Sequence, residues 1–423
     1  MLASLPSAFA TFSTASSNNV AIYWGQGPNQ GSLASYCSNA NINIIPVAFL
    51  VSINKLEVNV GNADITQVGK DIITCQGLGK TIILSIGGAT YTENELTSSD
   101  AAKTAAKNVW AAFGPKTATS KTRPFGDAVV DGFDFDIETK DLTNLDVFAQ
   151  ELRTLSDAET SKKYYLTAAP QCPYPDQADK SFLQGQVSFD AVFVQFYNNG
   201  CGLDKFVKGS TTQSAFNMAT WDKWASETSK NKNVKVFVGV PGSTSAAGSG
   251  YIDQATLADV ITYSKTFKSF GGIMAWDMVT IVGNTGYLAN INKALGGSPA
   301  SGTSSPTTKS SAAATTSKAS VTSAKPSHTA VGSTLTTKIK STITSSKAVA
   351  TATATATESE LPSTKTSDSQ NNATSAAAST TSISSSGAVP QWSQCGGTGY
   401  TGPTECASGF KCVKYDEWWS DCE

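Results

Sequence analysis

Residues 129–138 read VVDGFDFDIE, a run in which apolar and acidic side chains alternate. Successive side chains of a β-strand point to opposite faces, so Phe133, Phe135 and Ile137 share one face. The opposite face carries the three acids Asp134, Asp136 and Glu138. Buried carboxylates of like charge cannot all ionise, and a barrel or sheet interior is normally aliphatic. We therefore interpret the acidic row as a functional site rather than as an exposed polar edge.

Seven other apolar runs in the chain resemble strands. Together with Val129–Asp136, the expected strands are Val20–Trp24, Asn43–Ala48, Thr81–Ile86, Tyr164–Ala169, Asp190–Gln195, Val236–Val240 and Gly272–Trp276. Segments with helical spacing separate most of them, such as Asp141–Ser156. This alternation predicts an α/β fold, a (β/α)8 TIM barrel. An open doubly wound sheet is the alternative, but Tyr23–Gly27 lacks the glycine fingerprint expected after its first strand.

Glu138 is the last acid of the row, so a barrel would place it at the C-terminal mouth, where barrel active sites lie. We expect burial and the neighbouring acids to keep a proton on this group near neutral pH, which makes it a candidate general acid. None of the late strands ends in an opposing carboxylate, because alternation turns Asp277 away from the face of Trp276. The pattern therefore predicts that the substrate supplies the nucleophile, as the carbonyl oxygen of an N-acetyl sugar can.

The composition excludes several classes of function. A net charge of -2 and a pI of about 5.6 argue against nucleic-acid binding and suit a neutral polymer. No apolar run approaches the roughly 20 residues that span a membrane. The only histidine, His328, lies in a low-complexity segment, which excludes a Ser-His-Asp or Cys-His device. The eight cysteines include no C-x-x-C pair, so we expect disulfides in an oxidising compartment, with no metal and no cofactor.

Composition also divides the chain into four segments: residues 1–19, 20–297, 298–388 and 389–423. The first is signal-like or disordered and contains an A-x-A-like cleavage signal that ends at Ala10. The second is globular. The third, rich in Ser, Thr and Ala, is expected to be a disordered, O-glycosylated linker, with Asn372 in a sequon for N-glycosylation. The last is too short for a self-sufficient core and is expected to be a disulfide-knotted β module. These features predict a secreted protein that acts outside the cell or in its wall.

Residues 20–297 resemble the family 18 glycoside hydrolases, in particular the plant and fungal class III chitinases. The motifs that carry the resemblance are Ala21–Gln26, Ser85–Gly88, Asp131–Glu138, Ala168–Gln171, Gln195–Asn199 and Met274–Trp276. The resemblance implies an endo-acting chitinase that hydrolyses the β-1,4 bonds between N-acetylglucosamine units with retention. Its partner would be chitin.

The resemblance also implies a role for each site residue. Glu138 would be the acid and later the base, and Asp136 would hold the N-acetyl group for attack. Asp134 would exchange a proton with Asp136, Tyr197 would donate to the acetyl oxygen, and Trp276 would form the floor beneath the sugar. The residues implied to line the cleft are Tyr23, Gln26, Phe49, Gln171 and Gln195. Two disulfides, Cys37–Cys75 and Cys172–Cys201, would each tie a loop at the barrel mouth.

The last segment resembles the fungal family 1 carbohydrate-binding module over Trp392–Cys406 and the two cysteines that follow. The family pattern implies the bridges Cys395–Cys412 and Cys406–Cys422. It also implies a flat strip that stacks on a crystalline chain, made of Trp392, Trp418 and Trp419. Acids stand at Asp416 and Asp421, where the family usually has amides, so the choice between chitin and cellulose stays open.

Three alternatives remain beside a chitinase. The acidic row is shared with endo-β-N-acetylglucosaminidases that act on N-glycans, although a terminal binding module favours an insoluble polymer. A non-catalytic chitin- or wall-binding protein is disfavoured because Asp136, Glu138 and Tyr197 are all present. The terminal module taken alone would indicate a cellulase. We expect a monomer.

Overall fold

The structure is a computed structural model. It describes residues 11–91, 96–117, 120, 122–138, 142–297, 388–389, 394–397, 400, 402–414 and 420–422. These residues belong to two separate bodies, a large barrel and a small C-terminal module.

Eight parallel strands close into a barrel in the order β1-β9-β8-β7-β6-β5-β4-β2, and β1 pairs with β2 to complete the ring. The strands are β1 (Asn19–Ile22), β2 (Ile44–Ser52), β4 (Thr81–Gly87), β5 (Gly132–Asp136), β6 (Tyr165–Ala168), β7 (Ala191–Gln195), β8 (Lys235–Pro241) and β9 (Phe270–Trp276). A two-residue strand, β3 (Glu57–Val58), pairs antiparallel with the end of β2. The eight predicted strands and the TIM barrel are thereby confirmed.

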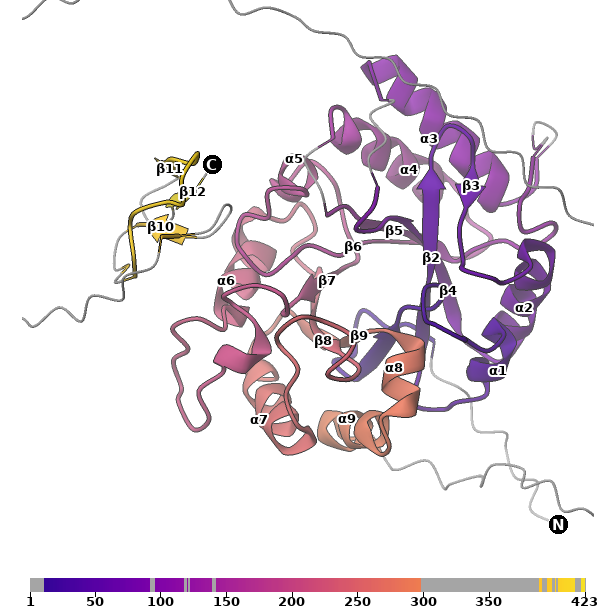
Figure 1. Ribbon diagram of the computed structural model, residues 1–423. Coiled ribbons are helices and arrows are strands. Elements are labelled where there is room, and N and C mark those ends of the chain that lie inside the picture. The colour runs from indigo at the N-terminus through magenta and orange to yellow at the C-terminus, as the bar shows by residue number, and fades with distance from the viewer. Residues whose placement is uncertain are drawn as a thin grey trace, which may run out of the picture. The chain divides into compact units, whose positions relative to one another are not determined.

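Helices surround the strands, as Figure 1 shows. They are α1 (Leu33–Cys37), α2 (Ile65–Gly77), α3 (Ser99–Phe113), α4 (Leu145–Ala158), α5 (Lys180–Leu183), α6 (Met218–Lys223), α7 (Gln254–Ser264), α8 (Met278–Gly283) and α9 (Tyr287–Leu295). Helix α4 was expected over Asp141–Ser156. Its Phe148 ring meets Phe135 of β5 at a centroid distance of 6.0 Å, which confirms that the apolar face of β5 packs on helices. Among the described residues, no helix has the length and apolarity needed to cross a bilayer.

The residues just before β1 close the N-terminal end of the barrel. Phe12 is buried, and its ring lies 4.6 Å from that of Tyr165 and 6.0 Å from that of Phe237. Its backbone N–H donates to Thr81 Oγ1 at 3.0 Å, and its carbonyl accepts from Tyr165 Oη at 3.0 Å. Residues 11–18 therefore have a defined place in the barrel, which differs from the expectation of a disordered N-terminus up to residue 19.

Two disulfides cross-link the barrel domain, Cys37–Cys75 and Cys172–Cys201, and both pairings are the predicted ones. Cys172–Cys201 joins the loop after β6 to the loop after β7, at the mouth, as expected. Cys37–Cys75 instead joins the last residue of α1 to the last turn of α2. Helices run back from the mouth to the opposite end of a barrel, so this bridge ties two helix ends there. The expectation that both bridges tie mouth loops is wrong for Cys37–Cys75.

The C-terminal module contains a three-stranded antiparallel sheet in the order β10-β12-β11. The strands are β10 (Gln394–Gly396), β11 (Cys412–Lys414) and β12 (Ser420–Cys422). Cys395 pairs with Cys412 and Cys406 with Cys422, as the family pattern implies. Because so small a sheet buries little apolar surface, these bridges supply much of its stability.

Candidate active site

The acidic row follows β5 from the barrel centre to its mouth. Asp134, the deepest acid, is fully buried and accepts three hydroxyl hydrogen bonds. Tyr23 Oη and Ser85 Oγ each donate to Asp134 Oδ2 at 2.7 Å, and Thr167 Oγ1 donates to Oδ1 at 2.6 Å. Burial raises the pKa of Asp134, while these three hydrogen bonds favour its ionised form and lower that pKa. The effect of burial is the larger, so the pKa of Asp134 is raised overall and the hydroxyl donors limit that rise.

Asp136, the middle acid, faces Glu138. Burial first, and then the charges of Glu138 and Asp134, raise the pKa of Asp136 well above its ordinary value. A side-chain hydrogen bond to Glu138 acts in the same direction, as expected when Asp136 carries the proton and donates it. Gln195 Nε2 donates to Asp136 Oδ1 at 2.9 Å and to Glu138 Oε1 at 3.3 Å. From the sequence, the proton of the row is expected on Glu138 at the mouth, whereas in the structure the strongly raised pKa belongs to Asp136.

Glu138 lies half-buried just beyond β5 and lines a cavity of about 280 Å³ at the mouth of the barrel. Phe49 and Trp276 also line it, with their rings stacked at 17° and 5.9 Å between centroids. Tyr197 completes this wall, and burial, followed by the charges of Asp136 and Glu138, raises its pKa well above the ordinary value. A flat aromatic floor beside a proton donor suits a sugar ring next to a scissile bond.

The structure brings most, but not all, of the predicted cleft residues to this cavity. Gln26 and Gln195 line it, and Gln26 Nε2 donates to Ala48 O at 2.8 Å. Tyr23 does not line it: its side chain is 2% exposed and lies beneath the cavity on Asp134. Gln171 does not line it either, and its Oε1 accepts from Asn199 Nδ2 at 2.9 Å. Tyr23 is therefore a support for the acidic row rather than a wall of the cleft.

Several residues of the site were missed by the sequence argument. Ser85 and Thr167 are the direct neighbours of Asp134 on β4 and β6, so their inward polar side chains were the available signal. Gly88 lines the cavity with φ +91°, and a Cβ there would lie 2.8 Å from the ring of Phe49. Only glycine fits this close approach in that backbone conformation. Others that line the cavity are Asn59, Thr90 and Asn198.

No opposing carboxylate faces Glu138 across the cavity: among the described residues that line it, Glu138 is the sole acid. Asp277, which follows Trp276, caps α8 instead, with its Oδ1 accepting from Thr280 N at 3.0 Å. Asp131, the first acid of the motif, also has a structural contact, since its Oδ2 accepts from Ile82 N at 2.8 Å. The part of the chain that the structure describes therefore supplies no second carboxylate on the opposite side of the scissile bond.

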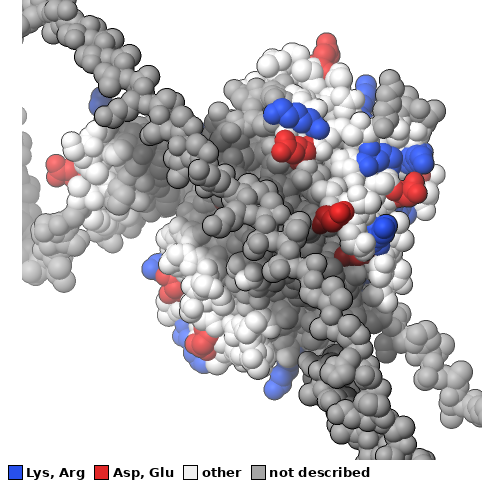
Figure 2. Space-filling model, turned by 45° about the vertical axis from the view of Figure 1, so that its right-hand side comes forward, with Lys and Arg blue, Asp and Glu red and all other residues white. Residues whose placement is uncertain are grey.

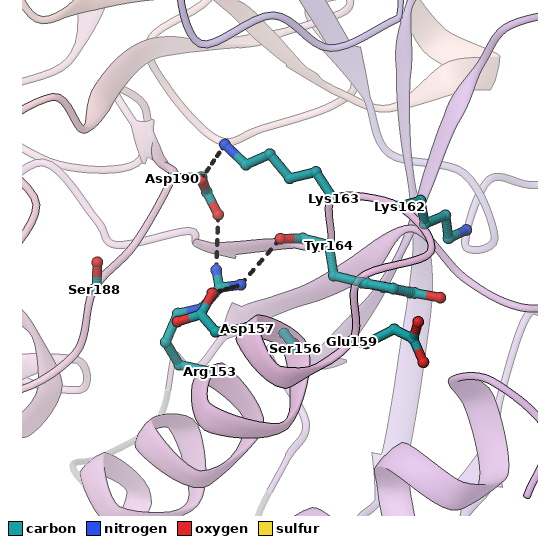
Figure 3. A pocket seen from close by; sticks show the side chains of 9 residues that line it. All are labelled: Arg153, Ser156, Asp157, Glu159, Lys162, Lys163, Tyr164, Ser188 and Asp190. Carbon is teal, nitrogen blue, oxygen red and sulfur yellow. Dashed lines mark hydrogen bonds and ion pairs between the residues drawn. The ribbon is translucent and has the colours of Figure 1, made fainter.

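A second cavity, of about 370 Å³, lies at the other end of the barrel (Figure 3). Asp190, at its centre, directly precedes β7, and Tyr164 directly precedes β6, so both mark the N-terminal ends of strands. Asp190 Oδ2 accepts from Arg153 Nη1 at 3.0 Å, and its Oδ1 lies 2.8 Å from Lys163 Nζ. Asp157 Oδ1 lies 2.7 Å from Arg153 Nη2, so two acids pair with two bases, and barrel enzymes do not place their chemistry at this end. We assign this cluster to barrel stability.

The described surface shows no large region of one charge in the view of Figure 2, where Lys and Arg are interspersed with Asp and Glu. This agrees with a neutral substrate, which needs no electrostatic steering. The tryptophans predicted to bind a polymer, Trp392, Trp418 and Trp419, lie outside the described residues.

Comparison with known proteins matches this site to a family. The family model described as Glycosyl hydrolases family 18 matches residues 19–250, which include the acidic row and Tyr197. The chain belongs to this family. Residues 391–419 match a second family model, described as Fungal cellulose binding domain. The family 18 hydrolase thus carries a second, carbohydrate-binding unit at its C-terminal end.

Fungal relatives share the barrel of this family 18 enzyme. A class III chitinase of Arthroderma benhamiae is 46% identical over 314 residues, which cover 70% of this chain and 91% of that protein. Endochitinase 33 of Trichoderma harzianum is 43% identical and is covered over 97% of its length. Among solved structures, the chitinase ICChI of Ipomoea carnea is similar at 28% identity and a TM-score of 0.57, covering 65% of this chain and 99% of that one. A xylanase and alpha-amylase inhibitor protein of Scadoxus multiflorus is similar at 30% identity and a TM-score of 0.56, covering 66% of this chain and 98% of that one.

Proposed function

We propose that this family 18 enzyme is a secreted endochitinase that cleaves β-1,4 bonds between N-acetylglucosamine units with retention at the anomeric carbon. The observation that carries the proposal is the acidic row: among the described residues that line the cavity no acid opposes Glu138, and Asp136 is the next acid of the row behind it. The chitinase names of the fungal relatives, which match this chain over nearly their whole length, support the choice of substrate.

In the first step, Glu138 gives its proton to the glycosidic oxygen as the bond from that oxygen to C1 breaks. The carbonyl oxygen of the substrate's own N-acetyl group forms a new bond to C1 from the opposite face. Asp136 accepts a hydrogen bond from the amide N–H, and Tyr197 donates to the acetyl oxygen, so both orient the attacking group. Asp134 stabilises the row and shares the proton of Asp136.

In the second step, the Glu138 carboxylate takes a proton from a water molecule whose oxygen attacks C1. The bond between C1 and the acetyl oxygen breaks, and the two inversions together retain the anomeric configuration. Trp276 and Phe49 provide the apolar surface under the sugar during both steps. Excluding water from this surface strengthens each hydrogen bond to the reacting groups.

The similarity to inhibitor proteins of the same fold shows why the site, and not the fold, carries the proposal. A barrel that only binds has no need for a proton-donating acid backed by a protonated neighbour. Asp134, Asp136, Glu138 and Tyr197 all stand together in this chain, which favours catalysis.

We further propose that residues 298–388 are a glycosylated linker and that the module holds the enzyme on a crystalline polysaccharide, chitin or cellulose. The match to a fungal cellulose binding domain supports a polysaccharide-binding role for the module, separate from the catalytic barrel. The even set of paired cysteines supports secretion into an oxidising compartment, and we expect a monomer.

The test compares chitin, cellulose and an N-glycosylated protein as substrates of the full-length enzyme. We expect soluble oligosaccharides from chitin alone, and about a 10³-fold loss of turnover in Glu138→Gln. The matched control is Glu227→Gln, an exposed glutamate 3.9 Å from Lys223 on the barrel surface, which should keep wild-type turnover. Release of glycans from the glycoprotein at the chitin rate, or full activity of Glu138→Gln, would contradict the proposal.

A further inference from the structure

The loop between β6 and α5 contains a buried carboxylate that the mechanism above leaves unused. Asp176 is 3% exposed, and both of its oxygens accept backbone hydrogen bonds. Oδ2 accepts from Gln171 N at 2.5 Å, while Oδ1 accepts from Ala178 N at 2.7 Å and Asp179 N at 3.2 Å. One side chain thus gathers three backbone N–H groups and defines the shape of the loop.

This loop is hydrogen-bonded to the residue that holds the acidic row. Gln171 forms a parallel bridge with Gln195, flanked by backbone hydrogen bonds of 2.8 and 3.2 Å. The side chain of Gln195 donates to both Asp136 and Glu138. Displacement of the loop that Asp176 holds would therefore move the amide that orients two of the three acids.

Asp176 also acts on the row through its charge. Burial raises its pKa to about 6 against the opposing effect of its backbone donors, and the charge of Glu138 adds to the rise. Its neighbour Asp179 is buried as well, and the charge of Asp179 contributes to the raised pKa of Asp136. The charge of Asp176 is therefore coupled to the charge of the acidic row.

We propose that Asp176 is a positioning residue for the reaction: it holds the loop after β6 against Gln195, so that the Gln195 amide stays in place on Asp136 and Glu138. The inference rests on the proposed role of Glu138 as the general acid. It assigns Asp176 no contact with substrate.

The first test replaces the charge but keeps the size, in Asp176→Asn of the full-length enzyme. With a fluorogenic chitobioside we expect kcat to fall about tenfold, which corresponds to about 1.4 kcal/mol, with KM within about twofold of wild type. We also expect the pH profile of kcat to change near pH 6, where Asp176 titrates, because asparagine has no carboxyl proton to lose.

The matched control is Asp253→Asn, which changes another carboxylate that accepts two backbone N–H groups, at the start of α7. It should lower stability without changing kcat or the pH profile. If folded Asp176→Asn behaves like this control, Asp176 has only a structural role and the proposal is overturned.

A second measurement does not depend on how well Asp176→Asn folds. Carbon-13 NMR of aspartate-labelled enzyme should show the Asp176 carboxyl titrating with a midpoint near 6, and a lower midpoint in Glu138→Gln. An unchanged midpoint in Glu138→Gln would contradict the electrostatic link. If the wild-type enzyme fails to cut chitin, the proposed function is refuted. The titration of Asp176 would still test its electrostatic coupling to Glu138, because the titration does not depend on turnover.

Discussion

Removal of one hydroxyl beneath the acidic row, in Tyr23→Phe, tests whether Asp134 works as a charged group. The ring stays in its contacts with Phe49, Phe193 and Trp276, and the change deletes the 2.7 Å hydrogen bond from Tyr23 Oη to Asp134 Oδ2. Hydrogen bonds to charged groups contribute about 1.5–3 kcal/mol. Since 1.4 kcal/mol is a factor of ten, the ionised form of Asp134 becomes roughly 10- to 150-fold less favourable.

The expected consequence is a redistribution of the shared proton. With one donor lost, Asp134 binds the shared proton more tightly. Asp136 then holds that proton less often and donates its hydrogen bond to Glu138 less often. Two donors remain, from Ser85 and Thr167, so the effect should lie at the lower end of the range. We expect kcat on a fluorogenic chitobioside to fall about tenfold, and the free energy of unfolding in urea to fall by about 2 kcal/mol.

Tyr165→Phe is the matched control for this experiment. It removes a hydroxyl whose 3.0 Å hydrogen bond goes to the neutral carbonyl of Phe12, at the other end of the barrel. We expect a loss of about 1 kcal/mol of stability and no change in kcat. If Tyr23→Phe keeps kcat within about twofold of wild type and matches Tyr165→Phe in stability, the hydroxyl does not sustain the charge of Asp134, and the reasoning is refuted.

Three further predictions concern stability, pH and the C-terminal unit. Phe12→Ala removes the ring that closes the barrel end and should lower the free energy of unfolding by about 3–5 kcal/mol. We expect Tm to fall by roughly 10 °C and kcat to stay unchanged. An unchanged Tm would show that the segment before β1 does not stabilise the barrel. The pKa of Asp176 rises from 3.8 to about 6 on folding, so the folded state binds more protons in that range and the free energy of unfolding should fall by about 3 kcal/mol as the pH rises through it. Urea denaturation at pH 4 and pH 7 checks this, and a wild-type slope that persists in Asp176→Asn would contradict it. A chain ending at Gly297 should hydrolyse soluble oligomers at the full-length rate and crystalline chitin more slowly, by reducing-sugar assay; equal loss on both substrates would contradict independent units.

Much of the fold could be predicted because the barrel repeats one pattern eight times. The alternation in β5 alone separates Phe133 and Phe135, which pack on helices, from Asp134 and Asp136, which point inward. The pattern can be recognised in the sequence because each strand has one face toward the barrel interior and one face toward the helices.

Depth and loop geometry could not be predicted in this way. Tyr23 was expected in the cleft because the family resemblance implied it, yet residue type does not reveal whether a ring lies above or below the acids. Asp176 was missed because its loop has no period, and the N–H groups that it gathers come together only in the folded chain. Two of the three hydroxyl donors to Asp134 could have been found from the sequence, because Ser85 and Thr167 lie in register with Asp134 on the neighbouring strands.

The most direct test of the mechanism is the configuration of the first product. Proton NMR of a chitin hexasaccharide, recorded in the first minutes after adding full-length enzyme, should show the new reducing end as the β-anomer, with the α-anomer appearing only later by mutarotation. A partly de-acetylated oligosaccharide should be cut only where the sugar on the non-reducing side of the bond retains its N-acetyl group. An α-anomer formed first, or equal cleavage after glucosamine, would show that Glu138 does not work with an amide supplied by the substrate.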